Sequence, residues 1–259
     1  MRRGIHLVIL IVIMQVLKVM AGANEITFAP AVFKSSASQA ALLELYSSEG
    51  CSSCPPAEKW LGDLKKRPAL WTQIVPVAFH VDYWNHLGWP DKFSSKEFTQ
   101  RQHAYAKNWK SDSVYTPEFV LNGAEWRRSG DILKASKKLA GVLKVSLAEN
   151  HKIVATFTPS GSKSADYKIW LALLGADISV AVKSGENGGR KLEHDFVVLS
   201  LQQQRMEKTA TDLVANLTLA MNQPIISTPR FAIAAWVSAA DELTPVQATG
   251  GWLQFRAKK

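Results

Sequence analysis

The two cysteines of this 259-residue chain, Cys51 and Cys54, are separated by two serines. An apolar run over 41–46 precedes them and a helical pattern follows, so the sequence predicts a strand, a sharp turn and a helix. A thiol in the first turn of a helix faces unpaired N–H groups and the positive end of the helix dipole, which stabilise its thiolate. A second thiol one turn away can resolve a mixed disulfide. The pair is therefore predicted to be a redox site.

Three other interpretations of the cysteine pair remain open. A structural disulfide would close a very short loop, which is worth only roughly 2 kcal/mol in the loop-entropy description. A zinc site would need a second cysteine pair or histidines at ligand spacing, and the chain has no third cysteine. The thiols could also be an inert chance pair. The strand–turn–helix context favours the redox site, and neither a metal nor a cofactor is predicted.

Residues 1–23 have the composition of a secretory signal peptide. Arg2 and Arg3 precede an apolar run over 5–20, and a small-residue cleavage site ends at Ala23. The sequence thus predicts a secreted or periplasmic protein, in an oxidising compartment where the cysteine pair would be a disulfide. Polar residues interrupt the apolar run, so an uncleaved anchor is the alternative. No later segment predicts a membrane span.

The composition is that of a globular protein, 47% hydrophobic and 20% charged, with a formal net charge of +9. The basic residues are spread along the chain and form no stripe with interleaved aromatic residues. Nucleic acid is therefore not expected as a partner. The expected partners are exported proteins that carry thiols or disulfides, and the oligomeric state is not predicted.

A first domain is predicted over 38–150. After the cysteine helix, the run 73–84 predicts a buried strand parallel to the first strand. An insertion over 85–112 follows, with a helical pattern in its second half. Pro117 then opens an apolar run that ends in an Asn-Gly hairpin turn, and a last helix is predicted over 131–147.

Several segments together resemble an exported thioredoxin-like family that is classed as domain of unknown function 1223. The resemblance implies a thioredoxin fold for the first domain. It also implies a cis peptide between Thr116 and Pro117 beside the cysteines, where the Thr116 backbone could pair with a substrate chain. It implies no particular substrate. The segments that carry the resemblance are 44–57, 79–84, 87–89, 114–117 and 185–187.

Further candidates are expected around the cysteine pair. Glu44 lies near the position where thioredoxins keep a buried carboxylate that accepts the proton of the resolving thiol. It is therefore a catalytic candidate beside the two cysteines, unless it faces solvent. Trp84 is a substrate-binding candidate together with Thr116 and Pro117. It belongs to an aromatic group that either caps the site or forms the core of the insertion.

Two histidines carry other expectations. His80 and Asp82 share one face of the predicted strand 73–84. Asp82 could reach the cysteine pair, whereas His80 is interpreted as a satisfied core histidine. The Glu-His-Asp segment over 193–195 contains the residue types of a catalytic triad. No serine in a nucleophile turn accompanies it, so it is interpreted as a polar strand edge.

The second half of the chain, 151–259, changes to short apolar or alternating runs that are separated by turn residues. This pattern predicts a smaller all-β, sandwich-like domain that packs on the first. The predicted fold class is therefore an α/β thioredoxin-like domain followed by a small β sandwich. The predicted strands of the second half are 152–157, 167–174, 178–182, 196–201, 213–219, 231–237 and 252–255.

Two functions fit these patterns, and the sequence leaves open whether the chain is an enzyme. The first is an exported thiol–disulfide oxidoreductase in which Cys51 attacks or is attacked, Cys54 resolves, and Thr116 and Pro117 align the substrate. This function needs no cofactor. The alternative is a non-catalytic envelope binding protein in which the cysteine pair is a fixed disulfide and Trp84 belongs to a recognition surface.

Overall fold

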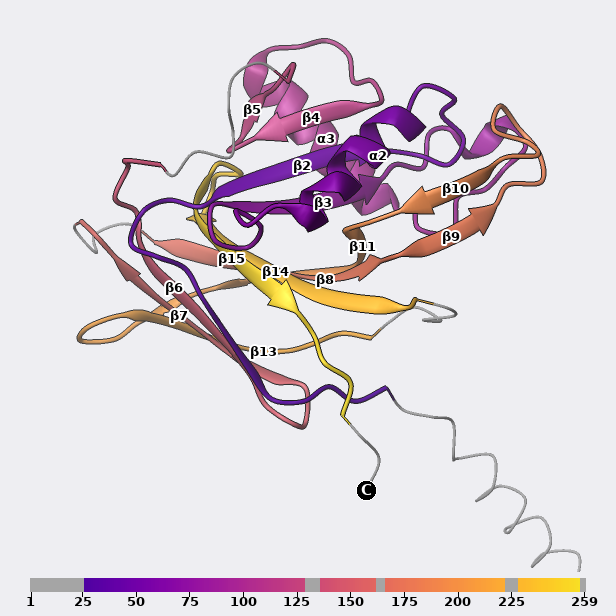
Figure 1. Cartoon of the computed structure of the whole chain (residues 1–259). Helices are drawn as coiled ribbons and strands as arrows, with labels where there is room; N and C mark the ends of the chain where they lie inside the picture. Colours follow the sequence, from indigo (N-terminus) through magenta and orange to yellow (C-terminus); the bar gives the residue numbers. More distant parts are fainter. Residues whose placement is uncertain (1–25, 129–135, 162–165, 222–227, 257–259) are drawn as a thin grey trace, which may run out of the picture.

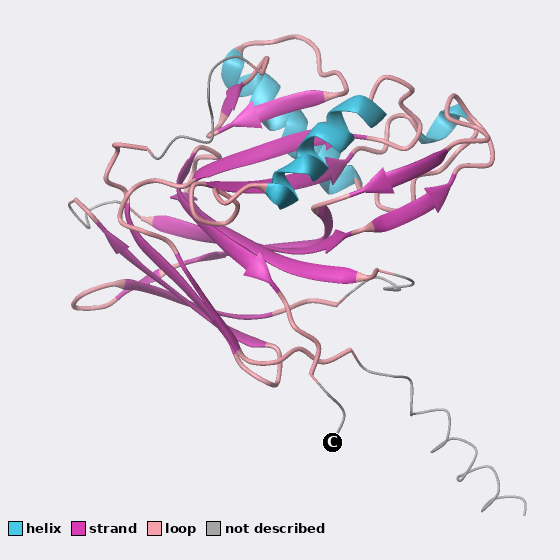
Figure 2. Ribbon diagram, viewed as in Figure 1, coloured by secondary structure: helices cyan, strands magenta, loops and turns pink. Residues whose placement is uncertain are grey.

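The computed structural model describes residues 26–128, 136–161, 166–221 and 228–256, and the predicted signal peptide lies outside them. The helices lie around β2 and β3, and a smaller sheet packs beneath β8 and β14 (Figures 1 and 2). The helices are α2 (Pro55–Gly62) and α3 (Lys96–Trp109), with short 3-10 helices η1 (Asp63–Lys66) and η2 (Asn85–Leu87). The strands are β1 (Ala31–Lys34), β2 (Ala41–Ser47), β3 (Ile74–His80), β4 (Glu118–Leu121), β5 (Ala124–Glu125), β6 (Gly141–Leu147), β7 (Lys152–Pro159), β8 (Tyr167–Ala176), β9 (Ile178–Ala181), β10 (Lys191–His194), β11 (Val197–Arg205), β12 (Glu207–Lys208), β13 (Leu213–Thr218), β14 (Arg230–Ala239) and β15 (Pro245–Trp252).

One eight-stranded sheet runs through the structure in the order β15-β14-β8-β11-β3-β2-β4-β5. Strands β2 and β3 pair in parallel along their whole length, which confirms the parallel pairing predicted for them. Strand β3 also pairs in parallel with β11, where Val197 lies opposite Ala78. The other neighbours in this sheet are antiparallel. A five-stranded antiparallel sheet has the order β1-β6-β7-β13-β12, and β9 pairs with β10 in a separate ribbon.

The predicted fold class is wrong. The prediction was an α/β thioredoxin-like domain followed by a smaller all-β, sandwich-like domain that packs on it. The structure is mostly β, with two α-helices in the described residues, and β2 to β5 continue the same sheet as β8, β11, β14 and β15. The pairing of β3 with β11 crosses the predicted boundary. The strands of the second half therefore extend the first sheet as well as forming one of their own.

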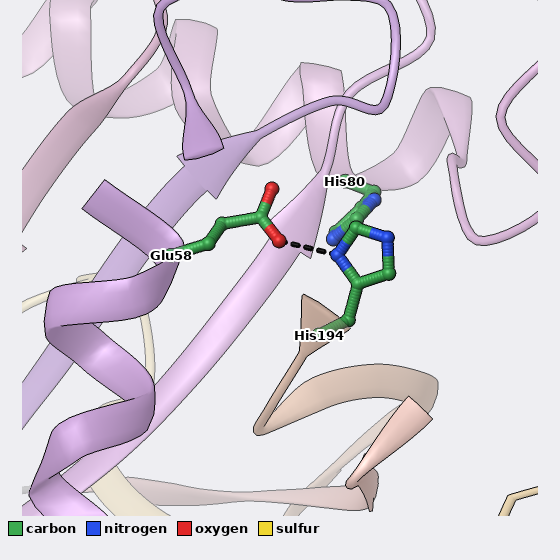
Figure 3. A group of neighbouring side chains, drawn as sticks. All are labelled: Glu58, His80 and His194. Carbon is green, nitrogen blue, oxygen red and sulfur yellow. Dashed lines mark hydrogen bonds and ion pairs between the residues drawn. The ribbon is translucent and has the colours of Figure 1, made fainter. Parts of the chain in front are cut away.

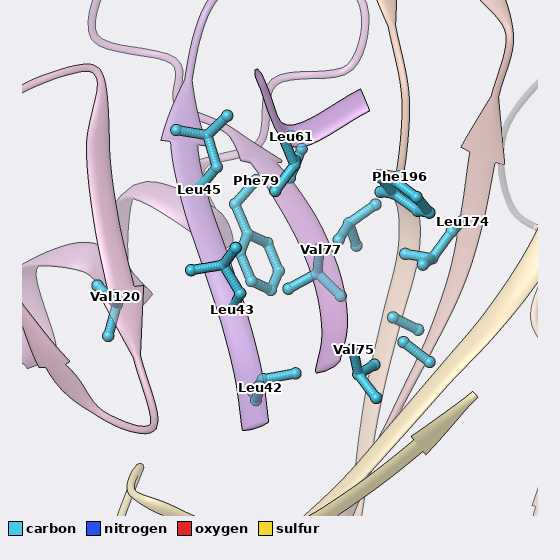
Figure 4. Close-up of a cluster of buried hydrophobic side chains, with 14 of the residues drawn as sticks. Leu42, Leu43, Leu45, Leu61, Val75, Val77, Phe79, Val120, Leu174 and Phe196 are labelled. Carbon is cyan, nitrogen blue, oxygen red and sulfur yellow. The ribbon is translucent and has the colours of Figure 1, made fainter. Parts of the chain in front are cut away.

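Strands β8 and β14 are buried on both faces, because successive side chains of a strand point to opposite sides. In β8, Trp170, Ala172 and Leu174 join the core beside the helices, and Ile169, Leu171 and Leu173 join the core between the two sheets. Strand β14 alternates in the same way. The helix-side core also contains Leu43, Phe79, Leu61, Phe196 and other residues of β2, β3 and α2 (Figure 4).

The two helices bury one face each. Ser95 is the N-cap of helix α3, and its hydroxyl accepts a hydrogen bond from the N–H of Glu97. Its buried residues, Phe98, Arg101, Gln102, Tyr105 and Ala106, recur at the three- and four-residue spacing of one helical face. Helices α2 and α3 lie on opposite sides of β2, since Glu44 of β2 contacts α3 whereas Ser47 contacts α2.

Two predicted elements differ from the structure. The helix predicted over 131–147 is wrong, because residues Gly141–Leu147 form β6, in which buried and more exposed residues alternate. Residues 129–135 lie outside the described part of the chain. The last strand, β15, precedes the predicted strand 252–255. The other six strands predicted in the second half are present as β7, β8, β9, β11, β13 and β14. None of the described helices is long and apolar enough to span a bilayer.

Candidate functional site

The cysteine turn connects β2 to α2, as the sequence predicts. Cys51 and Cys54 form a disulfide with their Cα atoms 5.4 Å apart. Both residues are buried, with 1% and 0% of their surface exposed. Ser52 and Ser53 between them are exposed. The surface of the turn is therefore polar, and the disulfide lies beneath it.

The start of α2 offers few free donors to a thiolate. Cys54 is the N-cap residue, and Pro55 and Pro56 occupy the first helical positions, where they contribute no N–H. The next two N–H groups, those of Ala57 and Glu58, donate to the carbonyl oxygen of Cys54 at 2.9 and 3.1 Å. A thiolate at this helix start would thus be stabilised mainly by the helix dipole.

The loop over 183–190, here named the cover loop, connects β9 to β10 and packs on the cysteine turn. Asn187 is fully buried, and its Nδ2 donates to the carbonyl oxygens of Glu49 at 2.9 Å and Cys51 at 3.0 Å. Nη1 of Arg190 donates to Asn187 Oδ1 at 2.7 Å and so fixes the orientation of the amide. One side chain therefore holds the cover loop to the backbone on the N-terminal side of the disulfide.

Two weaker contacts complete the attachment of the cover loop. The N–H of Ser52 donates to Glu186 Oε2 at 3.2 Å, and hydrogen bonds from the Ser52 hydroxyl and N–H lower the pKa of Glu186. The hydroxyl of Ser184 donates to the carbonyl oxygen of Gly88 at 2.7 Å. Glu186 and Ser184 are exposed, so water competes for both contacts.

The predicted substrate-binding residues lie beside the cysteine turn. The peptide bond between Thr116 and Pro117 is cis, as the resemblance implies. Nε1 of Trp84 donates to Oγ1 of Thr116 at 2.8 Å. A Cβ atom added to Gly50 would lie 2.9 Å from Cβ of Trp84, so the backbone and Cβ of Trp84 pack directly on the turn. Trp84 thus connects the cysteine turn to the cis peptide.

Glu44 is buried on the face of β2 that contacts α3. Nε and Nη2 of Arg101 donate to its two carboxylate oxygens at 2.8 and 3.0 Å. The hydroxyls of Tyr105 and Tyr46 also donate to it, at 2.6 and 3.0 Å. Burial, followed by the charge of Glu44, raises the pKa of both tyrosines well above the usual value. The contacts of Glu44 are with these three residues, and neither cysteine is among them.

A second buried cluster lies beside α2. It comprises Glu49, Glu58, His80, Asp91 and His194, and is named the His80–His194 cluster here. Nδ1 of His80 lies 2.6 Å from Oδ2 of Asp91. Nδ1 of His194 pairs with Oε2 of Glu58, and its Nε2 lies 3.3 Å from Oε1 of Glu49. The three side chains of Glu58, His80 and His194 converge from α2, the end of β3 and the end of β10 (Figure 3).

In this cluster, neighbouring opposite charges shift the pKa values more than burial does. Burial alone would lower the pKa of His194, but the carboxylates of Glu58 and Glu49 raise it to about 10. Burial also opposes charge on His80, yet Asp91 raises the pKa of that imidazole. Burial alone would raise the pKa of Glu58 and of Asp91. His194 nevertheless holds the pKa of Glu58 below its usual value, and His80 does the same for Asp91. The neighbouring carboxylates thus raise the pKa of both imidazoles.

The cluster keeps one polar atom without any partner. Nε2 of His80 is buried and has no hydrogen bond, whereas Nε2 of His194 and Oε1 of Glu49 have each other as an ion pair at 3.3 Å. Glu58 also lines a groove of about 420 Å³ between α2 and β10, with Leu192 and several lysines and acids along it. The cluster therefore combines an unpartnered buried imidazole nitrogen with one carboxylate residue that also lines a surface groove.

Sequence reasoning missed most of the cluster. Its interpretation of His80 as a core histidine fits the burial of that residue, whose Nδ1 contacts Asp91. The carboxylate of Asp82, which was expected to reach the cysteine pair, accepts a hydrogen bond from Thr99. The interpretation of 193–195 as a polar strand edge is wrong for His194, which is 1% exposed. The alternation of β10 carries a signal, because Leu192 and His194 share its buried face.

Comparisons with known proteins show which solved structures share this fold and to which family the chain belongs. A crystal structure of a protein from Agrobacterium tumefaciens is similar over 85% of this chain and 96% of its own, with 23% identity and a TM-score of 0.57. HBP35 of Porphyromonas gingivalis is similar over 84% of this chain and 76% of its own, with 14% identity and a TM-score of 0.57. At such identities these likenesses show a shared fold alone. No curated protein matches the sequence. The profile of the family described as protein of unknown function (DUF1223) matches residues 42–237, and the chain belongs to this family.

Proposed function

We propose that this chain is an exported thiol–disulfide oxidoreductase that oxidises dithiols of other exported proteins with its Cys51–Cys54 disulfide. The observation that carries the proposal is the position of the disulfide at the start of α2, beneath the cover loop. Export is supported by the signal-like composition of residues 1–23.

The reaction balances with a protein dithiol as the co-reactant. A substrate thiolate attacks Sγ of Cys51, the disulfide breaks, and Cys54 leaves as a thiolate. The second substrate thiolate then attacks the substrate sulfur of the mixed disulfide, and Cys51 leaves as a thiolate. The substrate loses two electrons and two protons and gains a disulfide, while the chain gains two thiols. Trp84 and Thr116 border the turn where the substrate chain would lie.

The burial of the disulfide sets a condition on this reaction. A substrate thiolate needs access to Sγ of Cys51, so the cover loop has to release the cysteine turn first. The loop is attached by the two hydrogen bonds of Asn187 and by exposed contacts such as that of Glu186 with Ser52. The same burial favours the alternative function, a binding protein with a fixed disulfide, if the loop does not open.

Thiol trapping in glutathione buffers separates the two functions. We expect a reduction potential above about −230 mV, the range of disulfides that act on substrates. The variant Asn187→Ala should react roughly tenfold faster with dithiothreitol, because two hydrogen bonds that hold the cover loop are lost. Asn216→Ala, an exposed change on β13, is the matched control and should leave the rate unchanged. A potential below about −300 mV, with no acceleration in Asn187→Ala, would support the fixed disulfide.

A further inference from the structure

We propose that Glu58, His80 and His194 form a binding site for a divalent transition metal, and that Zn²⁺ is the ion that suits its donors. The proposal concerns a site other than the cysteine pair and stands whether or not that pair is catalytic. Two imidazoles and one carboxylate are a ligand set that zinc uses when a fourth coordination position stays open.

The geometry of the three side chains is close to that of a coordination site. One ligand atom from each of Glu58, His80 and His194 lies within 4.8 Å of the others. In a tetrahedral site with bonds of 2.0–2.1 Å, ligand atoms lie about 3.4 Å apart, so small rotations of the side chains bring them together. The residues come from α2, β3 and β10, which gives the site rigid supports (Figure 3).

Each histidine already has a carboxylate on the nitrogen that would not bind the metal. Asp91 holds Nδ1 of His80, which leaves Nε2 for coordination. Glu49 Oε1 lies 3.3 Å from Nε2 of His194, which leaves Nδ1, the atom that now pairs with Glu58. Carboxylates placed in this way fix the tautomer and the orientation of metal-binding imidazoles.

One buried nitrogen of the cluster has no hydrogen-bond partner, which supports a ligand at this position. Nε2 of His80 has no hydrogen bond, although the residue is fully buried. An unsatisfied polar atom in the interior costs on the order of 1–3 kcal/mol, so proteins usually provide a partner for it. A metal bound between Nε2 of His80, Nδ1 of His194 and Glu58 would be that partner.

Charge and access are also consistent with a divalent cation. The cluster holds three carboxylates, those of Glu49, Glu58 and Asp91, beside two imidazoles. Buried carboxylates are normally paired with a cation or coordinate a metal, so a divalent cation suits this excess of acidic side chains. Glu58 also lines the groove along α2, so one of the three proposed ligands lies next to a surface groove.

The direct test is a titration of the purified chain with Zn²⁺ alone, with the disulfide kept oxidised. We expect one ion per chain, removed by a chelator and not displaced by Mg²⁺ or Ca²⁺, which prefer all-oxygen ligands. The double variant Cys51→Ser, Cys54→Ser should bind equally well. Loss of binding in that variant, or no binding by the wild type, would overturn the proposal.

Two further measurements identify the ligands. Asp91→Asn should weaken binding about 10- to 100-fold, the usual effect of removing a partner of a metal-binding histidine. His194→Gln should abolish it, whereas His151→Asn is the matched control, since His151 also has a buried Nε2 without a partner but lies outside the cluster. Because His194→Gln could fail to fold, the wild type is also loaded with Co²⁺. Its spectrum should show nitrogen and oxygen ligands, and a thiolate-to-cobalt band would contradict the assignment.

Discussion

Two buried polar clusters flank the same pair of parallel strands, and they are built differently. The Glu44–Arg101 cluster consists of Glu44, Tyr46, Arg101 and Tyr105, and both carboxylate oxygens of Glu44 accept hydrogen bonds. The Arg101 guanidinium also lies 4.7–5.5 Å from the centres of four aromatic rings. In the His80–His194 cluster, Nε2 of His80 is buried without a partner, and Nε2 of His194 has only the ion pair with Oε1 of Glu49 at 3.3 Å.

The difference separates a cluster that supports the fold from one that is suited to a ligand. In the Glu44–Arg101 cluster, Nη1 of Arg101 alone lacks an acceptor among the side-chain polar atoms, and the surrounding rings attract its charge. In the His80–His194 cluster, Glu58 lines a groove, and one ligand atom from each of Glu58, His80 and His194 lies within 4.8 Å of the others. Burial alone does not make a polar cluster functional. A buried imidazole nitrogen without a partner beside other ligand atoms is the more informative feature.

The largest expected effect comes from breaking the first cluster. Glu44→Gln should lower the free energy of unfolding by about 3–5 kcal/mol, because the charge of Arg101 is left buried without its counter-charge. Urea unfolding followed by tryptophan fluorescence measures this loss.

The double variant Glu44→Gln, Arg101→Met is the control for that prediction. It removes both charges and should regain most of the lost stability. If the double variant is no more stable than Glu44→Gln, the ion pair is not the cause. Disulfide exchange by the folded double variant also tests the role of Glu44 as a proton acceptor, and unchanged exchange would remove Glu44 from the catalytic candidates.

A smaller effect is expected from filling the second cluster. Zn²⁺ at 100 times its dissociation constant should raise the free energy of unfolding by about 2.7 kcal/mol, since it binds the folded chain only. The double variant at Glu44 and Arg101 should show the same increase, because its metal ligands are intact. An equal increase in His194→Gln would mean that zinc stabilises the chain from somewhere else.

The local elements of the first half follow from the sequence. The apolar run before Cys51, the prolines after Cys54 and the Asn122–Gly123 turn specify their own strand, helix and hairpin through nearby residues. The helix predicted over 131–147 failed because its window ran into β6, whose alternating pattern in Gly141–Leu147 is short.

The sheet order and the His80–His194 cluster could not be predicted in the same way. The pairing of β3 with β11 joins Ala78 to Val197, and hydrophobic periodicity does not say which distant strands pair. The cluster depends on that pairing, because it places His194, just before β11, beside His80 at the end of β3. A motif search therefore finds the cysteine pair, which is local in sequence, and misses a site made of segments more than a hundred residues apart.

The smallest effect concerns a buried carboxylate outside both clusters, which has neither a cation nor a histidine as a partner among the described residues. Glu118 is 3% exposed and accepts a hydrogen bond from Nε2 of Gln102 at 2.7 Å. Burial raises its pKa, the Gln102 amide opposes the shift, and Glu125 adds to it. This direction is opposite to that of Glu58, which has a histidine partner. The folded chain therefore holds the proton of Glu118 more tightly than the unfolded chain does.

When folding raises the pKa of a carboxyl group, the free energy of unfolding falls as the pH rises. The fall begins near the pKa in the unfolded chain, about 4.3, and continues through the pKa in the folded chain. Glu118→Gln removes this loss and keeps an oxygen for Gln102. We expect the variant to match the wild type near pH 4 and to be more stable at pH 7, by no more than about 1 kcal/mol. Urea midpoints at the two pH values measure the difference. A variant that is less stable at pH 7 would show that Glu118 has a cationic partner in solution, and the contrast with Glu58 would then no longer depend on the histidine.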